Sequence, residues 1–207
     1  MKKFIISVFI LCLSIPVFAE VNPYIAVRGG YEKSKQKTNY ESFWAEYGEP
    51  GITNIGGGSL FDDTAVLGIF AIGTDINQFR LEIAYSYKLI KEGMSVLNGE
   101  GIPQDYLNYN DKIKQQTLLA NLFYYPLHTM AINPFIGAGA GLGTLKIYDF
   151  DTKYKFAYAL YIGADYTFAK HFTLELMGTY NNIISPYSNA KDVQNFGGSL
   201  GVRYNFN

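Results

Sequence analysis

The feature that most constrains this chain is an alternation of apolar with polar or small residues, at the period of two that is typical of β-strands. In the clearest segment one parity is apolar throughout: Phe79, Leu81, Ile83, Tyr85, Tyr87 and Leu89. The other parity carries charged or small side chains: Arg80, Glu82, Ala84, Ser86 and Lys88. A soluble sheet with one buried face could show the same pattern. The number and the length of such segments therefore decide the fold class.

The alternation predicts eight strands, at 23–33, 63–74, 78–91, 113–126, 134–148, 154–168, 172–183 and 194–206. Their lengths suit tilted strands that cross a bilayer, which need about 9–11 residues. Prolines fall only at the ends of these segments or between them, as sheets require. The segment 63–74 is apolar on both parities, so its facing stays open.

The connections between these segments alternate in length. The first, third and seventh are long and the second, fourth and sixth are short; only the connection around Asp149 is shorter than the pattern expects. Long outside loops and short periplasmic turns are typical of outer-membrane barrels, and a sheet in hydrocarbon must close on itself. We predict an all-β fold, an eight-stranded antiparallel up-and-down transmembrane β-barrel spanning 20–207, with its apolar parity facing lipid.

The composition fits this assignment. Of the 207 residues 48% are hydrophobic and only 17% are charged, while the mean hydropathy is zero because two opposite parities cancel. Aromatic residues reach 16% and gather mostly near the predicted strand ends, as the girdles of a membrane barrel do. The rival assignment is a soluble β-sandwich with aromatic core faces.

The amino terminus predicts a secretory signal over residues 1–19. Lys2 and Lys3 precede an apolar stretch at 4–18, and cleavage is expected after Ala19. The stretch is too short for a spanning helix, which needs about 20 residues. Cys12 lies inside it without a small residue before it, which argues against a lipid anchor.

Several functional classes lack support in the sequence. A single cysteine excludes a disulfide scaffold or a cysteine zinc site, and a net charge of −1 gives no electrostatic support for a nucleic-acid partner. His128 and His171 fall in short turns without a recognisable catalytic partner. Asp149 and Asp151 could bind a surface cation, but a solvated hairpin tip is the preferred interpretation. We expect no enzyme, no cofactor and no metal.

The inward parity carries a set of charges expected to fill the lumen: Arg28, Glu32, Arg80, Glu82, Lys88, Asp165, Glu175 and Arg203. Counting from the strand ends places Arg28, Glu32 and Lys88 nearer the outside loops than the other five charges. Because buried charges must pair, a salt-bridged plug is the simplest interpretation; an ion path gated by the same residues is the alternative. Glu175 and Arg203 should lie within salt-bridge reach.

The long connection over 34–61 offers a different kind of site. It contains four aromatic residues among mixed charges: Tyr40, Phe43, Trp44 and Tyr47. Exposed aromatic residues on an outside loop are typical of contact surfaces. Alternatively, these side chains fold back on the barrel rim or insert into the outer leaflet.

Three segments resemble the opacity-protein and surface-antigen family of small, OmpA-type outer-membrane barrels. They are Pro-Phe-Ile-Gly-Ala-Gly-Ala-Gly at 134–141, Gly-Ala-Asp-Tyr at 163–166, and Gly-Val-Arg-Tyr-Asn-Phe at 201–206. The last is similar to the carboxy-terminal signal read by the barrel assembly machinery, with Gly201, Tyr204 and Phe206 at its key positions; Asn207 follows the aromatic residue that is usually last. The resemblance implies an exported outer-membrane protein of a Gram-negative-type cell, surface exposure and often adhesion or antigenicity, without catalytic residues.

Three functional hypotheses follow. The first is a non-enzymatic surface barrel, embedded in outer-membrane lipid as a monomer, whose outside loops contact ligands, host surfaces or other cells. The second is a small transport barrel for ions or apolar solutes. The third and weakest is a lipid-modifying outer-membrane enzyme.

Overall fold

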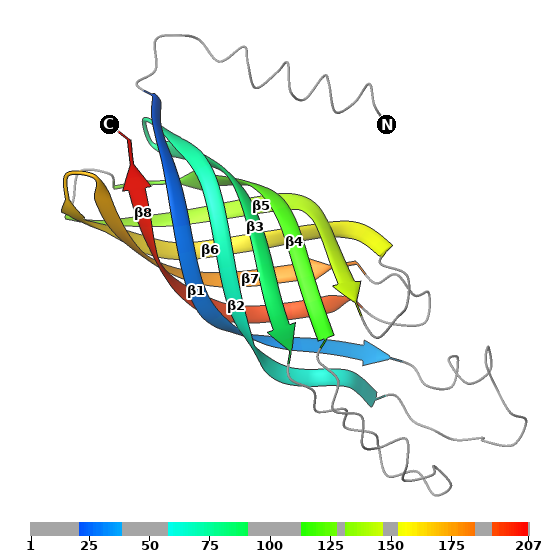
Figure 1. Ribbon diagram of the computed structural model, residues 1–207. Coiled ribbons are helices and arrows are strands. Elements are labelled where there is room, and N and C mark those ends of the chain that lie inside the picture. Colours follow the sequence, from blue (N-terminus) through cyan, green and yellow to red (C-terminus); the bar gives the residue numbers. More distant parts are fainter. Residues whose placement is uncertain are drawn as a thin grey trace, which may run out of the picture.

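The chain forms a single closed β-barrel (Figure 1). The computed structural model describes residues 21–38, 58–90, 113–127, 131–146, 153–184 and 192–206. The strands are β1 (Val21–Thr38), β2 (Gly58–Ile76), β3 (Phe79–Ile90), β4 (Ile113–Tyr124), β5 (Ile132–Lys146), β6 (Lys153–Ala169), β7 (Phe172–Ile183) and β8 (Val193–Asn205). Each pairs antiparallel with the next and β8 pairs with β1, which confirms the predicted fold class.

The two ends of the barrel differ. At one end, here the turn end, two residues join β2 to β3 (Asn77 and Gln78) and two join β6 to β7 (Lys170 and His171). Asn77 has a φ of 55°, a left-handed conformation that asparagine tolerates well. β1 begins and β8 finishes at this end, and the connections 39–57, 91–112, 147–152 and 185–191 leave from the opposite loop end (Figure 1).

The first hairpin is longer than predicted. β1 continues to Thr38 instead of residue 33, and β2 begins at Gly58 instead of residue 63, with Thr38 paired to Gly58. Polar residues such as Ser34 and Gln36 continue the backbone pairing beyond the apolar zone, where alternation no longer marks a strand. The other strand ends differ from the predicted ones by at most two residues.

The facing of β2, which the sequence left open, is now assigned. Val66 and Phe70 are exposed on the outer wall, whereas Leu67 and Ala71 are buried in the lumen. Both parities of β2 are apolar because its lumen-facing side chains pack among other apolar side chains of the interior, while its outward side chains form part of the apolar wall.

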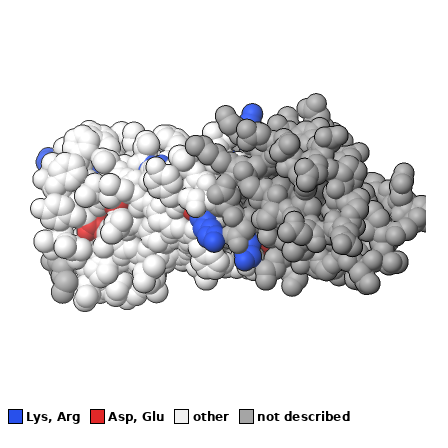
Figure 2. All heavy atoms as spheres, turned by 90° about the horizontal axis from the view of Figure 1, so that it is seen from below, with Lys and Arg blue, Asp and Glu red and all other residues white. Residues whose placement is uncertain are grey.

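The outer wall consists mainly of apolar side chains. Figure 2 shows few charged atoms over the described part of the barrel. Ile162, Leu176 and Val27 are each more than 60% exposed, which water would penalise and hydrocarbon would not. No helix in the described part of the chain is long and apolar enough to span a membrane.

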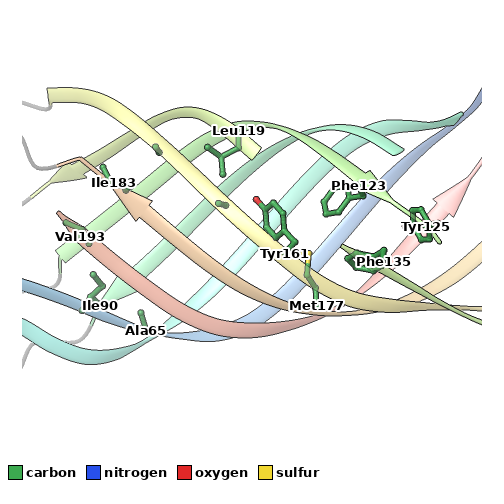
Figure 3. Packing of buried hydrophobic residues seen from close by; sticks show 12 residues of the cluster. Ala65, Ile90, Leu119, Phe123, Tyr125, Phe135, Tyr161, Met177, Ile183 and Val193 are labelled. Carbon is green, nitrogen blue, oxygen red and sulfur yellow. The ribbon is translucent and has the colours of Figure 1, made fainter. Parts of the chain in front are cut away.

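The lumen is packed with side chains along its length (Figure 3). Ile90, Ile183 and Val193 lie toward the loop end, whereas Phe123 and Phe135 lie toward the turn end. The aromatic residues therefore occupy the interior as well as the predicted girdles.

The inward glycines of β5 leave room for larger neighbours, as predicted. A Cβ at Gly137 would overlap the Phe123 ring, and one at Gly139 would overlap the Asn121 side-chain oxygen. Small residues opposite large ones let eight strands close around a filled interior.

Candidate functional site: a luminal ion network

Seven charged side chains meet inside the barrel, toward its turn end, and form what we call the luminal ion network: Arg28, Asp75, Arg80, Glu82, Asp165, Glu175 and Arg203. They come from six strands, and all but Asp75 are among the charges that the sequence placed in the lumen. Alternation along each strand brings them to the inner face, where they are separated from lipid and largely from water.

Arg28 links two carboxylates on opposite sides of the lumen. Its guanidinium donates a fork to Glu82, with Nη1–Oε1 at 3.0 Å and Nη2–Oε2 at 2.5 Å, and its Nε donates to Glu175 Oε2 at 2.5 Å. Arg28 pairs with Gly201 of β8, which pairs in turn with Glu175 of β7. The long Arg28 side chain therefore reaches both carboxylates, although the sequence analysis placed Arg28 nearer the outside loops than either of them.

Arg80 holds together two acids that would otherwise repel each other. Asp165 and Glu175 are directly opposite on β6 and β7, an arrangement that is destabilising for like charges. Arg80 Nη1 donates to Glu175 Oε1 at 2.6 Å and to Asp165 Oδ2 at 3.3 Å. Its guanidinium also lies 4.0 Å from the centre of the Phe123 ring and 4.9 Å from that of Phe135, within cation–π distance.

Arg203 completes the network at the turn end. Its Nη2 donates to Asp165 Oδ2 at 3.1 Å, and its Nη1 lies 3.5 Å from Asp75 Oδ1. The predicted approach of Arg203 to Glu175 is confirmed, with Nη1 3.8 Å from Oε1. Asp75 was missed because it follows the predicted end of its strand at residue 74.

Neutral donors add hydrogen bonds to two of the carboxylates. Glu82 accepts hydrogen bonds from the Tyr24 hydroxyl at 2.9 Å and from Asn121 Nδ2 at 3.1 Å. Asp165 accepts one from the Tyr125 hydroxyl at 2.6 Å. Burial raises the pKa of the Tyr125 phenol, so it remains a neutral donor. The sequence analysis missed these three donors, although the inward parity of Asn121 was a usable signal.

A second ion pair lies nearer the loop end. Lys88 Nζ is 2.5 Å from Glu32 Oε2 and 3.5 Å from Ser34 Oγ. A cavity of about 20 Å³, room for about one water molecule, lies between this pair and the network and is lined by Arg28, Glu32 and Glu82 among others. The charges therefore form a packed, paired interior around a very small internal space.

The other sequence candidates have different outcomes. Tyr40, Phe43, Trp44, Tyr47, His128, Asp149 and Asp151 lie outside the described residues. His171 lies in the β6–β7 turn as predicted, with Nδ1 3.0 Å from the Asn205 carbonyl oxygen. Within the described ranges, no three acidic, histidine or cysteine side chains are placed to hold a metal ion.

The three residues of the suspected assembly signal divide between the two faces of β8. Gly201 faces the lumen, where a Cβ would overlap Arg28 Cγ. Tyr204 and Phe206 face outward, with ring centres 5.3 Å apart, and Phe172 lies 5.2 Å from Tyr204. Gly201 thus has a packing role in the lumen, whereas the two aromatic residues belong to the girdle at the turn end.

Comparisons with known proteins agree with this architecture. The family model of the outer membrane protein beta-barrel domain matches residues 5–206. No curated protein sequence matches significantly. Among solved structures, OprG from Pseudomonas aeruginosa is 17% identical with a TM-score of 0.53, covering 89% of this chain and 96% of its own.

Two further solved structures are similar. Neisserial surface protein A is 16% identical with a TM-score of 0.52, covering 87% of this chain and 96% of its own; AlkL is 16% identical with a TM-score of 0.52, covering 93% and 94%. At these identities the likeness shows the fold alone. The family match covers nearly the whole chain, so this protein belongs to the outer membrane protein β-barrel family and resides in the outer membrane of a Gram-negative cell.

Proposed function

We propose that the chain is a non-enzymatic surface barrel whose loop-end connections contact ligands or other cells. The observation that carries the proposal is the filled lumen. Seven paired charges, together with packed rings such as Phe123 and Phe135, occupy the interior, and the cavity between the two charge groups has room for about one water molecule. A lumen filled in this way supports a structural role for the interior.

The first hairpin supports a contact role for the loop end. β1 and β2 reach past β3 and β4 in Figure 1, and their pairing continues to Thr38 and Gly58. This paired stalk leads into 39–57, which contains Trp44 and the three other candidate contact residues. Large aromatic side chains are over-represented in protein contact surfaces.

Adhesion of cells that display the barrel tests this proposal. Replacing 39–57 by Asn-Gly would keep the Thr38–Gly58 pairing while removing the candidate contacts, because Asn-Gly favours a two-residue hairpin turn. We expect adhesion of these cells to cultured epithelial cells to fall to background, while heat-modifiable gel mobility still reports a folded barrel. An equivalent replacement of 91–112 is the matched control. Unchanged adhesion after loss of 39–57 would contradict the proposal.

Conductance separates this function from the transport alternative. The barrel reconstituted in a planar bilayer should give no steady current, because the luminal charges are paired and closely packed. A steady ion current in the unmodified protein that disappears in Glu175→Gln would instead favour transport through the network.

We also propose that residues 1–19 are an export signal removed after Ala19. The expected mature protein begins at Glu20, and intact-mass measurement of the protein purified from outer membranes checks this. A mass that includes the first 19 residues would refute the proposal.

A further inference from the structure

The small luminal cavity, between the Lys88–Glu32 pair and the luminal ion network, has walls of mixed character. Its volume of about 20 Å³ is enough for one water molecule. Apolar side chains of three strands form part of its lining: Leu67, Leu119 and Met177. Figure 3 shows Leu119 and Met177 in the middle of the lumen, between the groups near its two ends. A molecule in the cavity would therefore be held by whichever polar atoms of the lining are still available.

Most polar side chains of the lining are already hydrogen-bonded to each other. The Tyr161 hydroxyl donates to Asn121 Oδ1 at 3.1 Å, and Asn121 Nδ2 donates to Glu82 Oε1 at 3.1 Å. The hydroxyl oxygens of Ser86 and Thr117 lie 2.5 Å apart, so one donates to the other. These groups have partners within the protein and do not require a further one.

β7 contributes two acceptors that differ from these groups. Asn181 is only 6% exposed, and its Oδ1 accepts no hydrogen bond from the described residues. Thr179 is two residues away on the same inner face, and its buried Oγ1 is likewise unpartnered within the described part of the chain. Both residues line the cavity. A buried acceptor without a donor is costly, so a donor placed in the cavity would be favoured.

Arg28 supplies spare donors to the same cavity. A guanidinium group has five N–H donors, and the contacts of Arg28 with Glu82 and Glu175 use one on each of its three nitrogens. One N–H therefore remains on each terminal nitrogen, and Arg28 is part of the cavity lining. The cavity thus has acceptors on β7 and donors on Arg28 of β1.

The charges around the cavity select a neutral guest. Arg28 is paired with Glu82, and Glu32, which also lines the cavity, is paired with Lys88 at 2.5 Å. A cation in the cavity would lie beside Arg28, and an anion would lie beside the two glutamates, so either would meet a like charge without water to screen it. Size, charge and hydrogen bonding together favour a molecule that is neutral, as small as water, and both donor and acceptor.

We propose that this cavity is a binding site for one water molecule that bridges β1 and β7 inside the barrel. The water accepts a hydrogen bond from a terminal N–H of Arg28 and donates to Asn181 Oδ1 and Thr179 Oγ1. Three hydrogen bonds are typical of a buried water. The bridge connects the luminal ion network to polar groups nearer the loop end. The site does not depend on the loop contacts proposed above.

Two NMR measurements on the folded barrel in micelles test the site. In perdeuterated protein, magnetisation transfer from water to the backbone amide of Asn181 should have the sign of a long-lived bound water. Oxygen-17 relaxation dispersion of the solvent counts such waters. Ala84 is buried and lines the cavity, so Ala84→Ile should fill it, abolish the transfer to Asn181 and lower the count by one. Thr179→Val keeps the shape of the side chain but removes one hydrogen bond, so it should weaken the transfer.

A matched variant and a change of salt separate the water site from other effects. Ala120→Ile makes the same substitution at an exposed position of neighbouring β4, and it should leave both measurements unchanged. Heat-modifiable gel mobility checks that each variant is folded. Replacing sodium chloride by choline chloride should have no effect, and a change would identify a bound cation and overturn the proposal. Absence of transfer to Asn181 in the unmodified barrel, or an unchanged water count in Ala84→Ile, would also overturn it.

Discussion

The role of Arg80 as the central cation of the lumen can be tested by replacing it with methionine. Arg80 is fully buried, with its guanidinium 2.6 Å from Glu175, 3.3 Å from Asp165 and 4.0 Å from the centre of the Phe123 ring. Methionine keeps an unbranched side chain that fills much of the same volume. The substitution therefore removes the charge and the hydrogen bonds without leaving a large cavity.

The structure gives a size for the effect. Removing one partner of a buried ion pair costs about 3–5 kcal/mol because the other charge is left uncompensated. Here Glu175 retains Arg28 at 2.5 Å and Asp165 retains Arg203 at 3.1 Å. We therefore expect a loss near the lower limit, about 3 kcal/mol in the free energy of unfolding.

Urea titration of the barrel in micelles, followed by far-ultraviolet circular dichroism and by gel mobility, measures this loss. Arg80→Met combined with Glu175→Gln should be less unstable than the sum of the two single variants by about 1–3 kcal/mol, since the second change removes the carboxylate that lost one of its cations. Lys114→Met, at an exposed position of β4, should change the free energy of unfolding by less than about 0.5 kcal/mol. Additive single effects, or a cost for Arg80→Met no larger than that of Lys114→Met, would refute the reasoning.

Three further changes test other parts of the barrel. Gly139→Val should cost about 1–3 kcal/mol because its methyl groups overlap the neighbouring asparagine of β4, whereas Gly68→Val should cost less than about 0.5 kcal/mol; urea titration compares them, and equal costs would contradict the packing argument. Tyr24→Phe should cost about 1.5–3 kcal/mol in the same assay because Glu82 loses a donated hydrogen bond, and a neutral result would contradict that role. Phe206→Ala should reduce membrane assembly in cells without changing refolding in micelles, because the last strand is expected to pair with the assembly machinery; equal assembly yields would count against the signal.

The alternation of residues was sufficient to predict the barrel and most of its facing. Arg80, Glu82 and Arg203 could be placed in the lumen from parity alone, because a one-residue shift would have moved each of them into lipid. Parity is a property of each strand by itself, so it needs no knowledge of how the strands are staggered. The closeness of Glu175 to Arg203 needed one further step: the two residues are on adjacent strands joined by a short connection, and counting from the strand ends places them at similar depth.

Features that depend on stagger, or on the ends of strands, could not be predicted in this way. The contact of Arg28 with Glu175 follows from the pairing of both residues with Gly201, which no single strand reveals. Asp75 and Tyr125 lie close to or just beyond strand ends, where the alternation fades. The inward packing of Phe123 and Phe135 was also missed as a cluster, because an aromatic residue fits either face of a barrel.

The glycines show why the two faces must be interpreted differently. Inside the lumen, a Cβ at Gly139 or Gly201 would overlap a side chain of the ion network or its hydrogen-bond partners, so these glycines are required by internal packing. On the outer wall, Gly29, Gly68, Gly178 and Gly198 have room for a side chain and are not required by internal packing. Because glycine weakens a strand interior, we expect a larger apolar side chain at these outward positions to be tolerated, whereas one at Gly139 or Gly201 would destabilise the barrel.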